Sequence, residues 1–243
     1  MRMLSLANRN TKEILRDPLN LSFGIGFPVI LILLLSAIQS KIPVPLFEIE
    51  SLTPGIAVFG LSFMTLFSAS LLAKDRSTSL LQRLYTTPLT PLDFILAYTL
   101  PIVPIAIAQS IVCYAFSLIF KLPISINILY AILSVIPNAL LYIGLGLLFG
   151  SILNDKQVGG ICGAALTNLS AWLSGAWFDL ELVGGGFKKV ANALPFVHAV
   201  ELQRAAISGN LAGVFPHLWW VLGYATVIIA AAILLFLRQM KRQ

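Results

Sequence analysis

Residues 74–93 read KDRSTSLLQRLYTTPLTPLD, a polar insert about one short helix long between two long apolar runs. Around it, 58% of the 243 residues are hydrophobic and only 11% are charged. A soluble domain carries roughly a quarter of its residues as charged side chains, so water is not the main solvent of this chain. We therefore expect an all-α membrane protein that holds the insert outside the bilayer.

Six apolar segments are long enough to span a membrane, which takes roughly 20 helical residues. They cover residues 19–38, 54–73, 92–120, 126–153, 158–178 and 216–237. The third segment is too long for a straight crossing and contains Pro101 and Pro104, which predict a kink or a tilt. The expected domain is a six-span unit over residues 19–237, followed by a basic tail at residues 238–243.

The first 18 residues predict an amphipathic helix on the membrane surface that ends before Pro18. A cleaved signal peptide is the alternative, but the long leader and its acidic residues disfavour it. The apolar residues of the helix are Leu4, Ala7, Ile14 and Leu15, interspersed with Arg2, Arg9, Lys12, Glu13 and Arg16.

Charge distribution predicts the orientation of the spans. Of the 16 lysine and arginine residues, eleven fall on the side of the termini and the insert, and five fall on the other side. The ten acidic residues divide evenly between the two sides. The positive-inside rule therefore places both termini and the insert in the cytoplasm. The pI near 9.5 reflects this topology and an attraction to anionic lipid, and it requires no nucleic-acid partner.

The insert itself predicts a short helix over about residues 77–87. Ser77 or Thr78 could cap it, and Pro88 and Pro91 would end it. Its apolar stripe consists of Leu80, Leu81, Leu84 and Tyr85. Such a stripe fits either a loop helix resting on the membrane or a docking helix for a soluble partner.

The order Asp75, Leu81, Leu84, Thr87, Pro88 and Leu89 after the second span resembles the cytoplasmic coupling segment of type-2 ATP-binding-cassette (ABC) exporter permeases. The six spans and the stretch LRDPLNLSFGIGFPVILILLL at residues 15–35 also resemble that family, in particular its drug and antibiotic-resistance group. One departure is the pair Ser79 and Leu80, where many relatives carry Gly-Thr. The resemblance implies that an ATPase subunit couples through Asp75, Arg76, Leu80, Leu81, Arg83, Leu84, Tyr85, Thr87 and Pro88.

No catalytic, cofactor or metal site is evident in the sequence. The G-x-x-x-x-G-K-[ST] phosphate loop is missing, so we expect ATP and Mg²⁺ to bind to a partner. His198 and His217 are too far apart in the sequence to imply a shared site. The resemblance implies two copies of an ABC ATPase subunit, a second and identical permease chain, and membrane lipid as partners.

Small residues predict close helix packing. Gly146 with Gly150 and Gly159 with Gly163 form two G-x-x-x-G pairs, which could pack helices within one chain or between two. The resemblance implies that the fifth span lies near a dimer axis and beside the transport pathway. The residues expected there are Gly159, Gly163, Asn168 and Trp172.

The segment at residues 179–215 is expected outside the cell. Residues 196–208 predict an amphipathic helix in which Glu201 and Arg204 pair at i, i+3. The resemblance implies short re-entrant helices here and an outer gate that includes Phe196, Glu201 and Arg204. Four tryptophans flank the segment and suit either an aromatic belt or contacts with an amphiphilic substrate: Trp172, Trp177, Trp219 and Trp220.

The expected function is that of a permease subunit of an ABC exporter in the bacterial inner membrane, moving a hydrophobic or amphiphilic compound outward. An exporter of a lipid-linked glycan is one alternative. A secondary carrier or channel is the other, although proton- and ion-coupled carriers usually need ionisable residues near the middle of the bilayer, and these spans have almost none.

Overall fold

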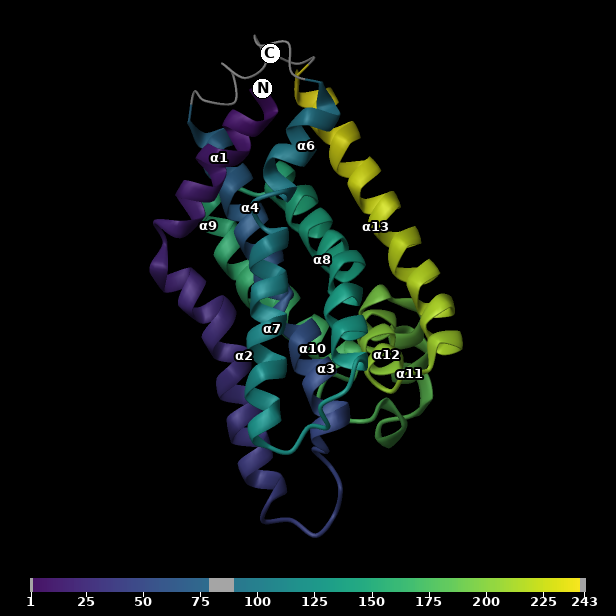
Figure 1. Cartoon of the computed structure of the whole chain (residues 1–243). Helices are drawn as coiled ribbons and strands as arrows, with labels where there is room; N and C mark the ends of the chain where they lie inside the picture. Colours follow the sequence, from purple (N-terminus) through teal and green to yellow (C-terminus); the bar gives the residue numbers. More distant parts are fainter. Residues whose placement is uncertain (1, 79–89, 241–243) are drawn as a thin grey trace.

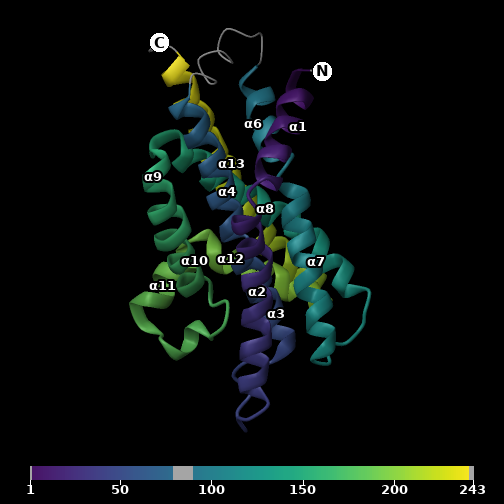
Figure 2. The same ribbon diagram turned by 90° about the vertical axis from the view of Figure 1, so that its left-hand side faces the viewer.

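The computed structural model describes residues 2–78 and 90–240, and throughout these ranges the regular secondary structure is helical. The helices run mostly lengthwise in an elongated bundle, with both chain termini at the same end (Figure 1). After a quarter turn, α9 and α10 lie along one flank of the bundle and α7 along the other (Figure 2).

Fourteen helical elements make up the described part of the chain. In order, they are α1 (Arg2–Leu15), α2 (Pro18–Gln39), α3 (Ile49–Gly60), α4 (Ser62–Ser77), α6 (Pro91–Thr99), α7 (Val103–Ile119), α8 (Asn127–Ile152), α9 (Asp155–Val158), the π-helix η1 (Gly159–Leu166), α10 (Thr167–Ser174), the 3₁₀-helix η2 (Leu180–Leu182), α11 (Gly185–Ala193), α12 (Pro195–Ile207) and α13 (Leu211–Met240).

Five helical segments in the described ranges are long and apolar enough to cross a membrane. They are Pro18–Gln39, Ile49–Ser77, Pro91–Ile119, Asn127–Ile152 and Leu211–Arg238. They correspond to the predicted first, second, third, fourth and sixth spans. The predicted fifth span forms the helical run α9, η1 and α10, in which no single helix has the required length. The six-span layout therefore stays a prediction.

The third candidate span is interrupted near its prolines, as expected for a kinked helix. Helix α6 ends at Thr99 and α7 begins at Val103, so the break contains Pro101, and Pro104 lies in the first turn of α7. Proline lacks a backbone N–H and cannot continue the hydrogen-bond ladder of a helix.

The second span is the centre of the bundle. Within its most apolar stretch 83% of residues are buried, against 28% for α2 and 22% for α13. Helices α2 and α13 therefore leave most of their apolar side chains on the surface, which suits contact with lipid.

The first glycine pair packs within the chain, where α8 crosses α4. A methyl group on Gly146 would lie 1.8 Å from Ser68 Oγ, and one on Gly150 would lie 2.8 Å from the Ala69 carbonyl oxygen. Across the same contact, Thr65 donates a hydrogen bond of 2.8 Å to the Tyr142 carbonyl. Only glycine permits such a close approach of the two backbones.

Helix α1 forms as predicted, but its buried face differs from the expected one. Leu6, Ala7 and Ile14 are buried, whereas Leu4 and Leu15 are exposed. The cause is that α1 packs on α6, α2 and α4 at the end of the bundle that carries both termini. Its apolar residues are therefore shared between a protein contact and an open surface.

Candidate functional site

The two ends of the polar insert lie at the end of the bundle that carries both termini (Figure 1). The predicted coupling residues Leu80, Leu81, Arg83, Leu84, Tyr85, Thr87 and Pro88 fall outside the described residues, as does Ser79. The described part of the site is therefore the base from which the insert leaves α4 and returns to α6. We call this base the insert anchor and define it by Asp75, Arg76, Arg9, Asn10 and Tyr98.

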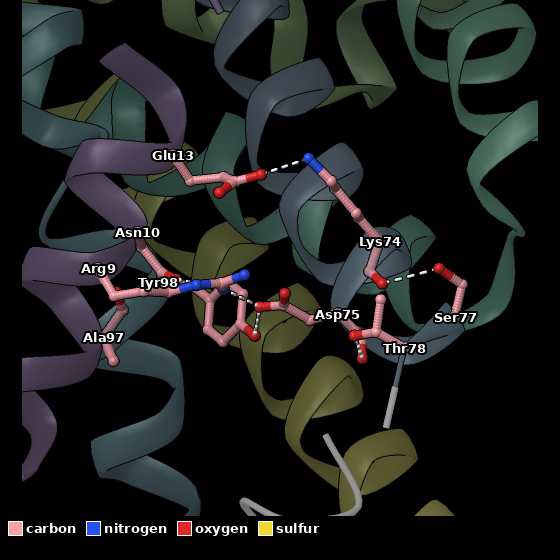
Figure 3. A network of polar contacts seen from close by, with 9 residues as sticks. All are labelled: Arg9, Asn10, Glu13, Lys74, Asp75, Ser77, Thr78, Ala97 and Tyr98. Carbon is pink, nitrogen blue, oxygen red and sulfur yellow. Dashed lines mark hydrogen bonds and ion pairs between the residues drawn. The ribbon is translucent and has the colours of Figure 1, made fainter. Parts of the chain in front are cut away.

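Asp75 is the centre of the insert anchor. Its side chain is 1% exposed, and its Oδ2 accepts hydrogen bonds from Arg9 Nη1 and from the Tyr98 hydroxyl, each at 2.5 Å (Figure 3). A carboxylate buried to this extent needs charged or hydrogen-bonding partners to offset the loss of water. The three side chains come from α4, α1 and α6, so they bind the N-terminal helix to both ends of the insert.

Asn10 strengthens the same contact and is fully buried. Its Nδ2 donates to the Ala97 carbonyl at 3.0 Å, and its Oδ1 accepts from Arg9 Nη1 at 3.0 Å (Figure 3). Partial burial opposes the charge of Arg9, but the hydrogen bond and the charge of Asp75 outweigh it and raise the pKa of the guanidinium. Arg9 therefore stays charged against Asp75.

A second ion pair joins α1 to α4 on the surface, between Glu13 and Lys74 (Figure 3). The hydrogen bond from Lys74 lowers the pKa of the Glu13 carboxyl, against the opposing effect of burial, and the positive charges of Lys74, Arg9 and Arg16 lower it further. Because Lys74 is 57% exposed, water screens this pair, and it contributes less than the buried one.

Arg76 anchors the insert to another helix. Its Nη1 donates to the Gly150 carbonyl at 2.8 Å and to the Leu153 carbonyl at 3.1 Å, at the C-terminal end of α8. Carbonyls at the end of a helix lack partners within that helix, and the helix dipole there favours a positive charge. Asp75 and Arg76 therefore lie on different faces of α4, and they contact α1 and α8, respectively.

Capping interactions define where the described helices meet the insert. Ser77 and Thr78 donate to the carbonyls of Lys74 and Asp75 in the last turn of α4. On the return side, Thr90 and Asp93 form a reciprocal capping box at the start of α6.

The residues predicted for the outer gate lie together on α12, far along the bundle from the insert anchor. Arg204 Nη1 contacts Glu201 at 2.8 Å, as predicted, and Arg204 Nη2 donates to the Gly175 carbonyl at 2.8 Å. Phe196 is buried beside Tyr142, with ring centroids 6.0 Å apart. Two cavities of about 690 and 380 Å³ share Glu201 and Arg204 in their walls.

The structure brings together two histidines whose separation in the sequence gave no reason to pair them. The Nδ1 atoms of His198 and His217 lie 3.0 Å from each other, and His198 stacks on Trp220 with ring centroids 4.7 Å apart. His198 Nε2 lies 3.0 Å from the Asn192 carbonyl, so it carries a proton and His198 Nδ1 accepts from His217. The signal was the short connection between α12 and α13, because two helices joined by a short turn pack against each other and bring residues of both close together.

The residues predicted for the dimer and pathway face mostly share one exposed surface of η1 and α10. Gly159 and Asn168 are exposed, and Trp172 is 53% exposed. A methyl group on Gly163 would lie at an ordinary 3.5 Å from Leu66, and one on Gly159 would find no atom of the described chain within 4 Å. The second glycine pair is thus not used for close packing within the described residues.

The other three predicted interface tryptophans differ in their surroundings. Trp219 and Trp220 are 70% and 46% exposed on α13, whereas Trp177 packs on Phe59 with ring centroids 5.1 Å apart. In the described ranges, no three histidine, cysteine, aspartate or glutamate residues gather closely enough to hold a metal ion.

Comparison with known proteins agrees with this architecture. Residues 1–208 match the family model described as ABC-2 type transporter. The capsule polysaccharide export inner-membrane protein CtrC of Neisseria meningitidis is 26% identical over 140 residues, which cover 57% of this chain and 53% of that protein. The match thus spans about half the length of the curated relative. No solved structure matches the chain.

Proposed function

The chain belongs to the ABC-2 type transporter family, and we propose on that premise that it is the permease subunit of an ATP-driven exporter that moves a hydrophobic or amphiphilic compound outward. ATP would bind and be hydrolysed on a separate ABC ATPase subunit. The central part of the polar insert, residues 79–89, would dock on that subunit through the apolar stripe expected from the sequence.

The observation that carries the proposal is the insert anchor. A coupling segment transmits force only if its ends are attached firmly to the helices that must move. Asp75 attaches one end to α1 and α6, and Arg76 attaches it to α8. In this proposal Asp75 does not touch the ATPase, because its carboxylate is buried and already accepts hydrogen bonds from Arg9 and Tyr98. It positions the segment that does.

The position of the termini supports six crossings and a cytoplasmic insert. Both termini lie at the same end of the bundle, which requires an even number of crossings (Figure 1). Five segments have the length of a span, and the run through α9, η1 and α10 would supply the sixth. The excess of lysine and arginine at the end with the termini supports its cytoplasmic location.

Two permease chains are proposed to pair through η1 and α10. This surface presents small and apolar side chains with open glycines, in contrast to Gly146 and Gly150, which are already packed against α4. Glycines with free space beside them allow another helix to approach closely within a membrane.

Export of a lipid-linked glycan is the second candidate. The relative from Neisseria is a capsule polysaccharide export protein, and this favours it. The larger outer cavity adds to this candidate, since polar residues such as Glu50, Asn127 and Asn210 line it and could bind hydroxyl groups.

The test is co-purification of the tagged chain with an ABC ATPase, identified by mass spectrometry, together with ATP hydrolysis in reconstituted membranes. The double change Leu81→Asp with Leu84→Asp should abolish both association and stimulated hydrolysis. Ile124→Asp is the matched control, because this leucine-sized side chain is 86% exposed far from the insert. Normal association and hydrolysis in the double variant would refute the docking role, and transport in ATP-free proteoliposomes would identify a secondary carrier instead.

A further inference from the structure

A cavity of about 290 Å³ opens beside the insert anchor, where α1 gives way to α2. Its floor is apolar and consists of Ile14, Leu21, Phe67 and Leu71. Its rim is polar and includes Glu13, Asp17, Asn20, Lys74 and Asp155. An apolar floor under a charged rim suits a molecule with an apolar body and a charged head.

Two features of the backbone shape the cavity. At its inner end, α2 touches α4 through Gly24, where a methyl group would lie 2.7 Å from Phe67 Cζ. At its outer end, Asp17 caps α2 and Pro18 begins it, which separates α2 from α1. The cavity therefore lies beside the first turn of the first candidate span, at the end of the bundle that carries both termini.

The rim favours a cation. Among the described residues that line the cavity, three carboxylates, on Glu13, Asp17 and Asp155, face a single ammonium group on Lys74, which is already paired with Glu13. Asp17 accepts hydrogen bonds from two neutral donors of its own helix, the backbone N–H and the side-chain amide of Asn20, at 3.1 and 2.7 Å. The positive charges of Arg9 and Arg16 also act on Glu13, and Lys156 follows Asp155 in the sequence, but none of the three lines the cavity, and Arg9 is paired with Asp75.

We propose that this cavity binds the transported compound from the membrane, and that the compound is a cationic amphiphile. Its ammonium or guanidinium head lies between Asp17 and Asp155, and its apolar body rests on Phe67 and Leu71. This proposal rests on the proposed export function and narrows its substrate class. An amphiphile with a phosphate head, the chemistry of many lipid carriers of glycans, meets like charges at the rim and binds poorly.

The location also links the compound to the insert. Lys74 lines the cavity and directly precedes Asp75, and Glu13 lies one turn of α1 after Arg9. A bound cation competes with Lys74 for Glu13 and so acts on the surface ion pair that holds α1 against α4. Occupancy of the cavity is thereby sensed at the base of the proposed ATPase-docking segment.

The experiment compares two probes on the full-length chain in phosphatidylcholine nanodiscs, with empty nanodiscs as the background. One probe is a dansyl-labelled alkyl chain that ends in trimethylammonium, and the other is the same labelled chain that ends in phosphate. Dissociation constants come from fluorescence titration. We expect the ammonium probe to bind at least about fivefold more tightly, given the modest energies of partly exposed charge pairs.

Three variants test the rim. Asp17→Asn combined with Asp155→Asn should weaken the ammonium probe about fivefold and remove the discrimination, while asparagine at position 17 keeps the helix cap. Lys74→Gln should change affinity in the opposite direction and tighten ammonium binding. Glu181→Gln, the matched loss of one negative charge at the other end of the bundle, should change nothing. The opposite sign for Lys74→Gln separates a charge effect from misfolding, which would weaken both variants.

Equal binding of the two probes, tighter binding of the phosphate probe, or unchanged affinity in the double variant would overturn the proposal. The titration needs neither ATP nor the ATPase subunit, so its outcome is independent of the co-purification test. If the ATPase associates but the probes bind equally, the export function remains supported and the proposal of a cationic substrate is refuted. If the ammonium probe binds but no ATPase associates, the cavity stands and ATP-driven export falls.

Discussion

Removing Arg9 should cost more than removing the charge of its partner Asp75. In Arg9→Gln, the carboxylate of Asp75 stays 1% exposed and loses its charged partner, while the hydrogen bond from the Tyr98 hydroxyl remains. Breaking a fully buried ion pair from one side costs about 3–5 kcal/mol. Because Arg9 is 37% exposed, screening reduces this, and we expect about 2–3 kcal/mol.

Asp75→Asn should cost only about 1 kcal/mol. The asparagine oxygen can still accept from Tyr98, and the released guanidinium of Arg9 can turn to water. The double variant should therefore resemble Asp75→Asn alone, since no buried charge is left in either. Such a pattern is a coupling energy of about 2–3 kcal/mol between the two residues.

Amide hydrogen exchange over residues 3–15 measures the effect where it occurs. A loss of about 2–3 kcal/mol corresponds to a fall in protection of α1 of roughly 30- to 150-fold in Arg9→Gln. Lys12→Gln removes the same charge from an exposed position on the same helix and should leave protection unchanged. Equal costs for Arg9→Gln and Asp75→Asn, or additive costs in the double variant, would refute the buried ion pair as the force that holds α1.

Two further predictions concern other contacts. Gly146→Ala should lower the free energy of unfolding by roughly 1–3 kcal/mol or more, because the added methyl would lie 1.8 Å from Ser68 Oγ. Gly159→Ala should be tolerated in the single chain, because no atom of the described residues lies near its added methyl. Equal melting temperatures for the two variants would contradict the close crossing of α4 and α8. The pKa of His198 lies below its usual value of 6.5, mainly through burial and further through His217, against opposing effects of the Asn192 carbonyl and Glu201. The folded state then binds fewer protons than the unfolded state. The contribution of His198 to the free energy of unfolding is therefore complete above pH 6.5 and declines as the pH falls from 6.5 through the lowered pKa. His198→Gln should reduce the fall in melting temperature over this pH range. An unchanged pH dependence of the melting temperature would count against the histidine contact.

Much of the architecture could be predicted from composition and local pattern. Runs of about 20 apolar residues predicted six spans, and five of them correspond to helical segments long and apolar enough to cross a membrane. Pro101 indicated the break in the third, and the spacing of Glu201 and Arg204 indicated their ion pair. All of these depend on residues near each other in the chain. Helix geometry alone determines which of them are neighbours.

The insert anchor could be predicted only in part. Asp75 and Arg76 were expected to face an ATPase, but their partners, Arg9 and the carbonyls of α8, are 66 and 74 or more residues away in the sequence. No local period indicates such a contact. The meeting of His198 and His217 across the turn between α12 and α13 was missed for a similar reason, since it depends on how two helices cross.

The sequence by itself therefore predicted a membrane protein, the approximate extent of its long helices, the break at Pro101 and a polar segment outside the bilayer. The physical reason is that solvent preference and helix formation act through windows of about 20 residues or fewer. Tertiary structure alone decided that Asp75 is buried, that Gly146 serves packing while Gly159 remains open, and that α1, α2 and α4 enclose an acidic-rimmed cavity. Those properties arise where segments distant in the sequence meet. A charge that is buried at such a contact needs a partner from another helix, and the resulting ion pair holds the two helices together.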